Sequence, residues 1–158
     1  MLPGWMVRAY IKGLIDEDVQ VQPAGIDLTV DRIEVFVEEG LIGFSDRRLP
    51  KTENLTPTEG LWHLERGAYK IVFHETVRVP GDKAGLCVPR SSLLRMGASL
   101  ECALWDPGYV GKGEALLAVH NLHGIVIEKH ARVAQLFYIS VDRPLHSQYR
   151  GSYQGRWL

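Results

Sequence analysis

The sequence predicts an all-β domain, either a barrel or a sandwich, and two observations lead to that prediction. Runs of alternating apolar and polar residues recur along the chain, and Gly and Pro residues interrupt them at short intervals. Alternating βα units would instead place long helical segments between the strands. With 158 residues the chain is long enough to bury a core. We therefore expect one domain over residues 1–158.

The start of the chain departs from this β pattern. Residues 4–15 mix apolar positions with Arg8 and Lys12, which fits a short helix with one apolar face. Strand-like runs then follow at residues 26–30, 33–37, 69–79, 85–88, 98–105, 114–120, 124–128 and 132–141. Residues 45–60 are polar and contain two prolines, so we expect a surface loop. Residues 146–158 contain few aliphatic side chains, so we expect a flexible C-terminal arm.

The composition argues against several classes of protein. The formal net charge is -1, so there is no basic excess to neutralise a nucleic-acid backbone. No apolar run is long enough to span a bilayer, and residues 1–5 do not resemble a signal peptide. Cys87 and Cys102 form no close-spaced ligand pattern, and we interpret them as reduced thiols of a cytoplasmic protein. The sequence leaves a disulfide between them open.

Five short segments are rich in groups that hold a nucleoside triphosphate. They are residues 24–28 (Ala-Gly-Ile-Asp-Leu), 89–92 (Pro-Arg-Ser-Ser), 106–111 (Asp-Pro-Gly-Tyr-Val-Gly), 132–136 (Arg-Val-Ala-Gln-Leu) and 149–155 (Tyr-Arg-Gly-Ser-Tyr-Gln-Gly). Together they supply carboxylates for a metal ion and a water molecule, and cationic and hydroxyl groups for phosphates. They also supply an aromatic ring for a sugar and a mobile flap.

The first two segments suit phosphate and metal chemistry. Asp27, at the entrance to a strand, can hold a hydrated Mg²⁺ ion, or it can simply cap its own turn. Ser91 or Ser92 can cap a short helix that closes at Gly97, and the free amides of that helix start suit a phosphate. Across residues 90–95, two arginines and two serines can donate hydrogen bonds to phosphate oxygens, or they can belong to an ordinary surface helix. These side chains are Arg90, Ser91, Ser92 and Arg95.

The remaining segments suit the nucleoside and the reaction. Asp106 and Tyr109 place a carboxylate and an aromatic ring on a tight turn, which Asp-Pro-Gly favours by itself. Gln135 can bond a phosphate oxygen or face solvent from a half-buried strand. In the tail, Tyr153 can stack on a base while Arg150 meets the terminal phosphate.

The histidines offer a competing interpretation. His120 and His123 lie near metal-ligand spacing, but residues 121–124 lie between two strand-like runs. A hairpin turn explains that segment with fewer assumptions, and no cysteine cluster supplies further zinc ligands. The other histidines are scattered and carry no signal.

The ordered set of five segments resembles the dUTPase and dCTP deaminase family, and in particular the archaeal dUTPases on its deaminase-like side. The resemblance implies a distorted jelly-roll or β-clip barrel with a small helix after the Pro-Arg-Ser-Ser motif. It also implies a homotrimer with Mg²⁺-dependent sites at subunit interfaces. In those sites Asp106 activates a water molecule, and Tyr109 packs against deoxyribose. Backbone groups of the 98–105 and 111–120 strands read the uracil.

The residues favour hydrolysis of dUTP to dUMP and pyrophosphate over deamination of dCTP. Deaminating relatives carry a glutamate on the strand after the third motif, where Ala118 stands here. An alanine cannot transfer a proton, and Glu114 lies four residues earlier, roughly 10 Å or more along a strand. Two alternatives remain open: a dCTP deaminase, perhaps bifunctional, and a non-catalytic nucleotide-binding regulator.

Overall fold

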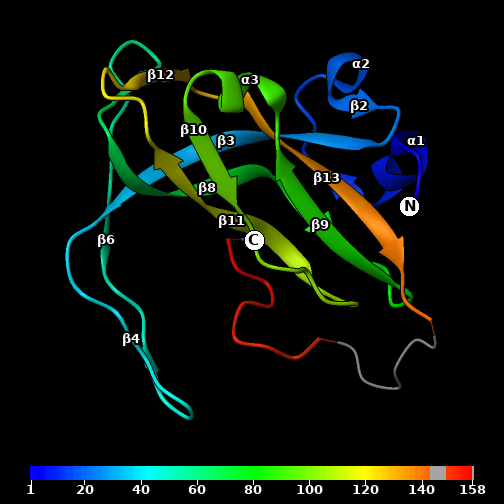
Figure 1. Ribbon diagram of the computed structural model, residues 1–158. Coiled ribbons are helices and arrows are strands. Elements are labelled where there is room, and N and C mark those ends of the chain that lie inside the picture. The colour runs from blue at the N-terminus through cyan, green and yellow to red at the C-terminus, as the bar shows by residue number, and fades with distance from the viewer. Residues whose placement is uncertain (143–148, 158) are drawn as a thin grey trace.

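An antiparallel β-barrel carries most of the chain in the computed structural model, which describes residues 1–142 and 149–157 (Figure 1). The long strands are β3 (Gly25–Phe36), β8 (Gly67–Arg78), β9 (Lys83–Pro89), β11 (Val110–Val119) and β13 (Arg132–Ser140). The short strands are β1 (Ile11–Lys12), β2 (Val21–Gln22), β4 (Leu41–Ile42), β5 (Arg47–Arg48), β6 (Thr52–Asn54), β7 (Leu61–Leu64), β10 (Ala98–Glu101) and β12 (Ile125–Glu128). The helices are α1 (Gly4–Val7), the 3-10 turn η1 (Arg8–Tyr10), α2 (Glu17–Gln20) and α3 (Ser91–Arg95). The all-β prediction is confirmed.

The main sheet follows the strand order β10-β11-β8-β3-β13-β9. Every neighbouring pair along this path is antiparallel. The path nearly closes on itself, because Gly85 of β9 and Trp105 after β10 exchange two backbone hydrogen bonds of 2.8 and 2.9 Å. Barrel closure of this kind leaves few strand edges unpaired.

The core lies inside the barrel. Burial alternates along β11 as a half-buried strand requires, whereas residues 25–30 of β3 are buried on both faces. The largest fully buried side chains come from four different strands: Phe73, Ile26, Leu117 and Tyr138. The sequence patterns of residues 69–79, 114–120 and 132–141 therefore correspond to strands whose apolar face forms the core, whereas of residues 98–105 only Ala98–Glu101 form a strand.

Three local predictions need correction. Residues 4–15 form only α1 and η1 before the chain extends into β1, so the predicted helix is shorter. Residues 45–60 lie at the surface but contain β5 and β6. Residues 121–124 form a turn, in which Gly124 N donates to Asn121 O at 3.0 Å, but not a hairpin, because β12 pairs with β7 rather than with β11.

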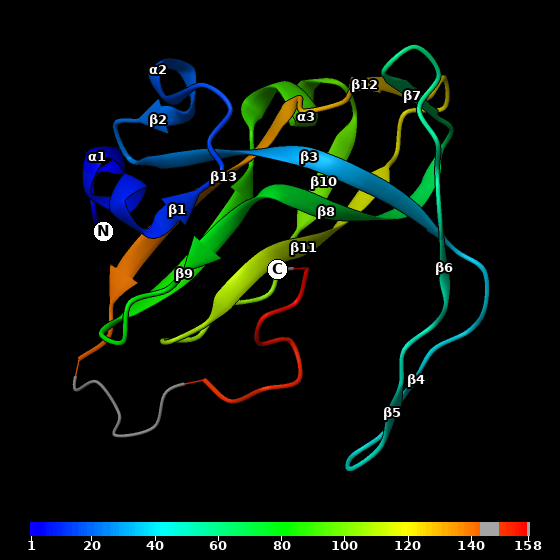
Figure 2. The same ribbon diagram turned by 180° about the vertical axis from the view of Figure 1, so that it is seen from behind.

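A hairpin of β4 and β5 projects away from the barrel in both views (Figures 1 and 2). Its tip carries two strongly exposed apolar side chains, Ile42 at 92% and Phe44 at 108%. Exposed apolar groups of this size typically mark a surface that meets another molecule.

The N-terminal helices pack against one end of the barrel through a buried polar network. Glu75 is fully buried and accepts hydrogen bonds from Gln20 Nε2 at 2.7 Å and from Thr29 N at 2.9 Å. Gln20 Nε2 also donates to Asp27 O at 2.9 Å. This network fixes the backbone at Asp27, the first of the predicted site residues.

Two further properties of the described residues bear on the sequence predictions. Both Cys87 and Cys102 are free thiols. None of the described helices combines the length and the apolar character needed to cross a bilayer.

Candidate active site

A tight turn between β10 and β11 presents Asp106. Tyr109 N donates to Asp106 O at 3.1 Å, and Gly108 has φ of +88°, as a turn with Pro at its second position and Gly at its third requires. The Asp106 side chain is exposed, and no hydrogen bond or ion pair to a described residue holds its carboxylate. This carboxylate is therefore available to a water molecule or a ligand.

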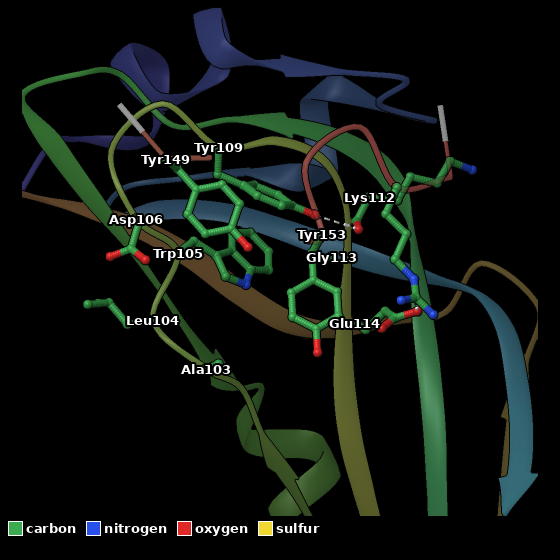
Figure 3. A pocket seen from close by; sticks show the side chains of 11 residues that line it. Ala103, Leu104, Trp105, Asp106, Tyr109, Lys112, Gly113, Glu114, Tyr149 and Tyr153 are labelled. Carbon is green, nitrogen blue, oxygen red and sulfur yellow. Dashed lines mark hydrogen bonds and ion pairs between the residues drawn. The ribbon is translucent and has the colours of Figure 1, made fainter. Parts of the chain in front are cut away.

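Asp106 lies at the edge of a cavity of about 280 Å³ whose walls are largely aromatic. The lining residues are Ala103, Leu104, Trp105, Asp106, Tyr109, Lys112, Gly113, Glu114, Tyr149, Tyr153 and Arg156. Figure 3 shows the aromatic rings gathered on one side, and the Asp106 carboxylate directed away from them. Four of these side chains are aromatic and four are charged, and the aromatic rings offer a flat apolar surface to a planar ligand.

Tyr109 forms the floor of this cavity. Its hydroxyl donates to Lys112 O at 2.9 Å, and its ring packs beside Trp105 with centroids 6.1 Å apart. Burial, followed by the nearby Glu114 carboxylate, raises the pKa of Tyr109 to about 12. The ring is therefore neutral and fixed, as a contact surface for a sugar needs to be.

The opposite wall carries charge that the sequence did not reveal. Glu114, on β11, lies 3.1 Å from Arg156 Nε and accepts a hydrogen bond of 2.8 Å from Trp157 Nε1. Behind it, Lys70 lies 3.9 Å from Glu114 and also pairs with the buried Glu34. A register shift in the pairing of β11 with β8, between Lys112 and Glu114, accompanies this placement of Glu114.

The C-terminal segment lies across the cavity of its own chain. Its backbone bonds the turn and β11 at three points: Tyr149 N to Pro107 O at 2.9 Å, Gly155 N to Val110 O at 2.8 Å, and Lys112 N to Arg156 O at 3.1 Å. These bonds bring the predicted Tyr153 into the cavity wall, while Arg150 is exposed. Residues 146–148 and 158 of the predicted arm lie outside the described residues.

A second group of predicted residues meets at the junction of β3, β13 and β9. Asp27 pairs in register with Gln135, which pairs with Val88 of β9. The Asp27 side chain is 2% exposed, and its Oδ2 atom lies 3.0 Å from Arg90 Nε and 3.1 Å from Arg132 Nη1. Burial raises the pKa of Asp27, while the two arginines act in the opposite direction.

Arg132 is the residue of this junction that the sequence did not single out. It follows Asp27 by 105 positions, and only the antiparallel pairing of β13 with β3 brings the two together. In the sequence, the one indication of a role for Arg132 was its position at the start of the fourth segment, residues 132–136. Gln135 is half-buried at the same junction.

The helix α3 presents the remaining predicted residues. Ser91, Ser92 and Arg95 are all exposed, and Leu93 anchors the helix in the core. The predicted serine cap is wrong, because Arg90 occupies the N-cap position and no side chain caps the helix. The predicted close at Gly97 is confirmed, with φ of +79° at that glycine.

The predicted residues thus form two groups within one chain. Asp106, Tyr109 and Tyr153 line the aromatic cavity, whose lining includes no residue of the Asp27 junction or of α3. The junction and α3 form the second group, which carries exposed hydroxyl and cationic side chains.

The fold and the cavity define an antiparallel barrel protein with a pocket between aromatic and charged side chains. The comparisons with known proteins narrow this class. A family model described as dCTP deaminase-like matches residues 1–141, and the chain belongs to that family.

Curated relatives from archaea match nearly end to end. A protein named "Probable deoxyuridine 5'-triphosphate nucleotidohydrolase" from Aeropyrum pernix is 48% identical over 138 residues, which cover 87% of each chain. A protein named deoxyuridine 5'-triphosphate nucleotidohydrolase from Methanocaldococcus jannaschii is 42% identical over 144 residues, 89% of this chain and 90% of its own.

Solved structures show the same fold at lower identity. The 2'-deoxycytidine 5'-triphosphate deaminase from Agrobacterium tumefaciens aligns with a TM-score of 0.69 and 22% identity over 87% of this chain. The aligned part is 46% of the deaminase, so this chain spans about half its length. The native EIAV dUTPase aligns with a TM-score of 0.51 and 19% identity over 94% of both chains.

Proposed function

We propose that this protein hydrolyses dUTP to dUMP and pyrophosphate, which supplies dUMP for thymidylate synthesis and keeps uracil out of DNA. The observation that carries the proposal is the unpaired Asp106 carboxylate at the edge of an aromatic cavity. The names of the archaeal relatives, at up to 48% identity, support the choice of substrate. We infer a cytoplasmic location, where thiols such as Cys87 and Cys102 stay reduced.

Asp106 acts as the general base. It accepts a proton from a water molecule, whose oxygen attacks the α-phosphorus of dUTP. The bond from that phosphorus to the bridging oxygen breaks, and pyrophosphate leaves with the bond's electron pair. Because no contact with a described residue holds the Asp106 carboxylate, it is free to orient this water.

The aromatic cavity holds the nucleoside. The fixed ring of Tyr109 packs against deoxyribose and leaves no room for a 2'-hydroxyl, and Tyr153 stacks on the base. Backbone groups of β10 and β11 read the edge of the uracil ring, which distinguishes it from cytosine by the pattern of donors.

The exposed polar groups of α3 and the junction hold the triphosphate. Ser91, Ser92 and Arg95 donate from the helix, and Gln135 donates from β13. Arg90 has its Nε atom on Asp27, and its Nη1 atom donates to Arg132 O at 3.4 Å, so its Nη2 atom is the one that we assign to a phosphate. Arg150, exposed on the C-terminal segment, meets the terminal phosphate.

The residues fit a hydrated Mg²⁺ ion better than a directly bound one. Asp27 is buried and both arginines contact its Oδ2 atom, so the side chain offers at most its other oxygen through a water molecule. When bound, Mg²⁺ neutralises charge on the leaving pyrophosphate.

Self-association as a homotrimer explains why the predicted residues fall into two groups. Within one chain the cavity lacks the phosphate-binding side chains of α3 and the junction. A complete site therefore combines the cavity of one copy with α3 of another. The exposed apolar tip of the β4–β5 hairpin supports contact between copies.

Mixing two inactive variants tests the shared site. Asp106→Asn and Arg95→Ala chains, unfolded and refolded together, restore about one quarter of the sites if each site draws on two copies in random order. Each variant refolded alone is the control. No recovery in the mixture would place the whole site within one chain.

Product analysis tests the reaction itself. The purified protein is incubated with dUTP and with dCTP, with and without Mg²⁺, and we expect dUMP and pyrophosphate from dUTP. Asp106→Asn should bind nucleotide but slow hydrolysis by about 10²- to 10⁴-fold. The exposed Asp142→Asn, after β13, is the matched control and should leave the rate unchanged. Nucleotide binding without turnover in the wild type would instead support a regulator.

Deamination of dCTP is the second candidate, and one observation favours it. The carboxylate of Glu114, which the strand count places too early, does line the cavity. Its contacts with Arg156 and Trp157 leave it less free than Asp106. Ammonia release from dCTP that Glu114→Gln abolishes would decide for this activity.

A further inference from the structure

Two histidines that are far apart in the sequence meet beside β3. His74 lies on β8 and His130 lies in the turn between β12 and β13, and their rings pack edge to face with centroids 4.8 Å apart. Asp31 of β3 completes the group, and one potential ligand atom of each residue lies within 4.8 Å of the others. None of the three lines the aromatic cavity.

Both imidazoles have a buried nitrogen that forms no hydrogen bond within the described part of the chain. The Nδ1 atoms of His74 and His130 are buried, and neither has a hydrogen-bond partner among the described residues. His74 Nδ1 lies 3.8 Å from Asp31 Oδ1, which is too far for a hydrogen bond. Buried polar nitrogens without a partner are rare in folded proteins, so two in contact require an explanation.

The backbone holds the three side chains in place. Asp31 stands at an irregularity in the pairing of β3 with β8, between Val30 and Arg32. His130 adopts the left-handed conformation with φ of +65°, and its N–H donates to Val30 O at 2.9 Å. This conformation favours Gly or Asn, so an imidazole there is held at some conformational cost.

We propose that Asp31, His74 and His130 form a binding site for a divalent transition-metal ion such as Zn²⁺, separate from the proposed Mg²⁺ site. Two imidazole nitrogens and one carboxylate oxygen are a common ligand set for zinc, with a fourth position left to water. Ligands of one tetrahedral zinc ion lie about 3.4 Å apart, so donors that lie within 4.8 Å of one another need to close by at most roughly 1.4 Å, which side-chain rotation provides.

Two lysine side chains beside Asp31 must move when a cation binds. Lys112 Nζ lies 3.6 Å and Lys129 Nζ lies 3.9 Å from the Asp31 carboxylate, so the bound cation replaces loose ion pairs. Both ammonium groups reach solvent and can withdraw from the incoming ion.

Metal titration with ligand variants tests the proposal. The probes are Zn²⁺ by calorimetry and Co²⁺ by visible absorption, with millimolar Mg²⁺ present throughout. The wild type should bind one ion per chain, and its thermal unfolding midpoint should rise with Zn²⁺. His74→Phe keeps a ring against His130, and His130→Asn tolerates the left-handed backbone. Asp31→Asn removes the charged ligand.

Loss of a residue that only supports a metal ligand typically lowers metal affinity by about 10- to 100-fold. Each variant here removes a ligand itself, so its affinity for Zn²⁺ should fall by at least that factor. His123→Gln, which removes an exposed histidine elsewhere, is the matched control and should keep full affinity. Circular dichroism without metal shows that each variant folds. Absence of saturable binding to the wild type at about 100 µM Zn²⁺, a range in which structural sites are full, would overturn the proposal. Binding that survives in His74→Phe, or that is lost in His123→Gln, would overturn it as well.

Discussion

Truncation of Asp27 to alanine should destabilise the fold even when no metal ion is present. The Asp27 carboxylate is the one acidic group that Arg90 and Arg132 contact at the junction of β3, β13 and β9. Its removal leaves two cationic side chains next to each other at the edge of the core. If Asp27 acted only through Mg²⁺, its truncation would leave the stability of the metal-free protein unchanged.

The structure gives the size of this effect. At an effective dielectric constant of about 20, two opposite charges about 3 Å apart attract by roughly 5 kcal/mol. Burial of Asp27 offsets much of that attraction, as its raised pKa indicates. Breaking a buried pair typically costs 3–5 kcal/mol. The Arg90 and Arg132 side chains are 29% and 31% exposed, so they partly rehydrate, and we expect a loss of about 3 kcal/mol.

Urea unfolding at a fixed protein concentration, without Mg²⁺, measures the effect. Asp27→Asn keeps the shape and one acceptor oxygen, so it should lose only about 1 kcal/mol. Asp142→Asn, at an exposed position after β13, should lose nothing measurable. If Asp27→Ala lost less than about 1 kcal/mol, the carboxylate would not be holding the two arginines.

Three further changes have defined outcomes. Lys70→Met leaves Glu34, which is 5% exposed, without its ammonium partner, and circular dichroism during urea unfolding should show a loss of about 3 kcal/mol. The free energy of unfolding should fall between pH 10 and 12, because Tyr109 keeps its proton in the folded protein and releases it in the unfolded chain. Tyr109→Phe should remove this part of the fall, which is at most about 2.7 kcal/mol. Ending the chain at residue 148 opens the aromatic cavity, and the KM for dUTP should rise by about tenfold, equivalent to 1.4 kcal/mol, with an unchanged circular dichroism spectrum. An unchanged KM in the shortened chain would show that the C-terminal segment does not contribute to nucleotide binding.

Features that depend on a few neighbouring residues were predictable. Asp106, Pro107 and Gly108 specify their turn because Pro fixes one backbone angle and Gly permits a positive one. The alternation of apolar and polar residues over 114–120 predicts a half-buried strand, because successive side chains of a strand point to opposite faces of the sheet. The error at residues 121–124 has a physical cause: the turn is local, but the partner of the following strand is not.

The sequence by itself determined the long strands, the turn that carries Asp106 and the short helix after Pro89, because neighbouring residues settle backbone conformation. Only the tertiary structure decided which distant side chains meet. Strand register in the barrel brings Arg132 to Asp27 across 105 positions, and it turns Glu114 into the aromatic cavity. It also gathers Asp31, His74 and His130, whose spacing in the sequence carries no signal. Pairing between remote strands is set by closure of the whole barrel, and no short stretch of sequence contains that information.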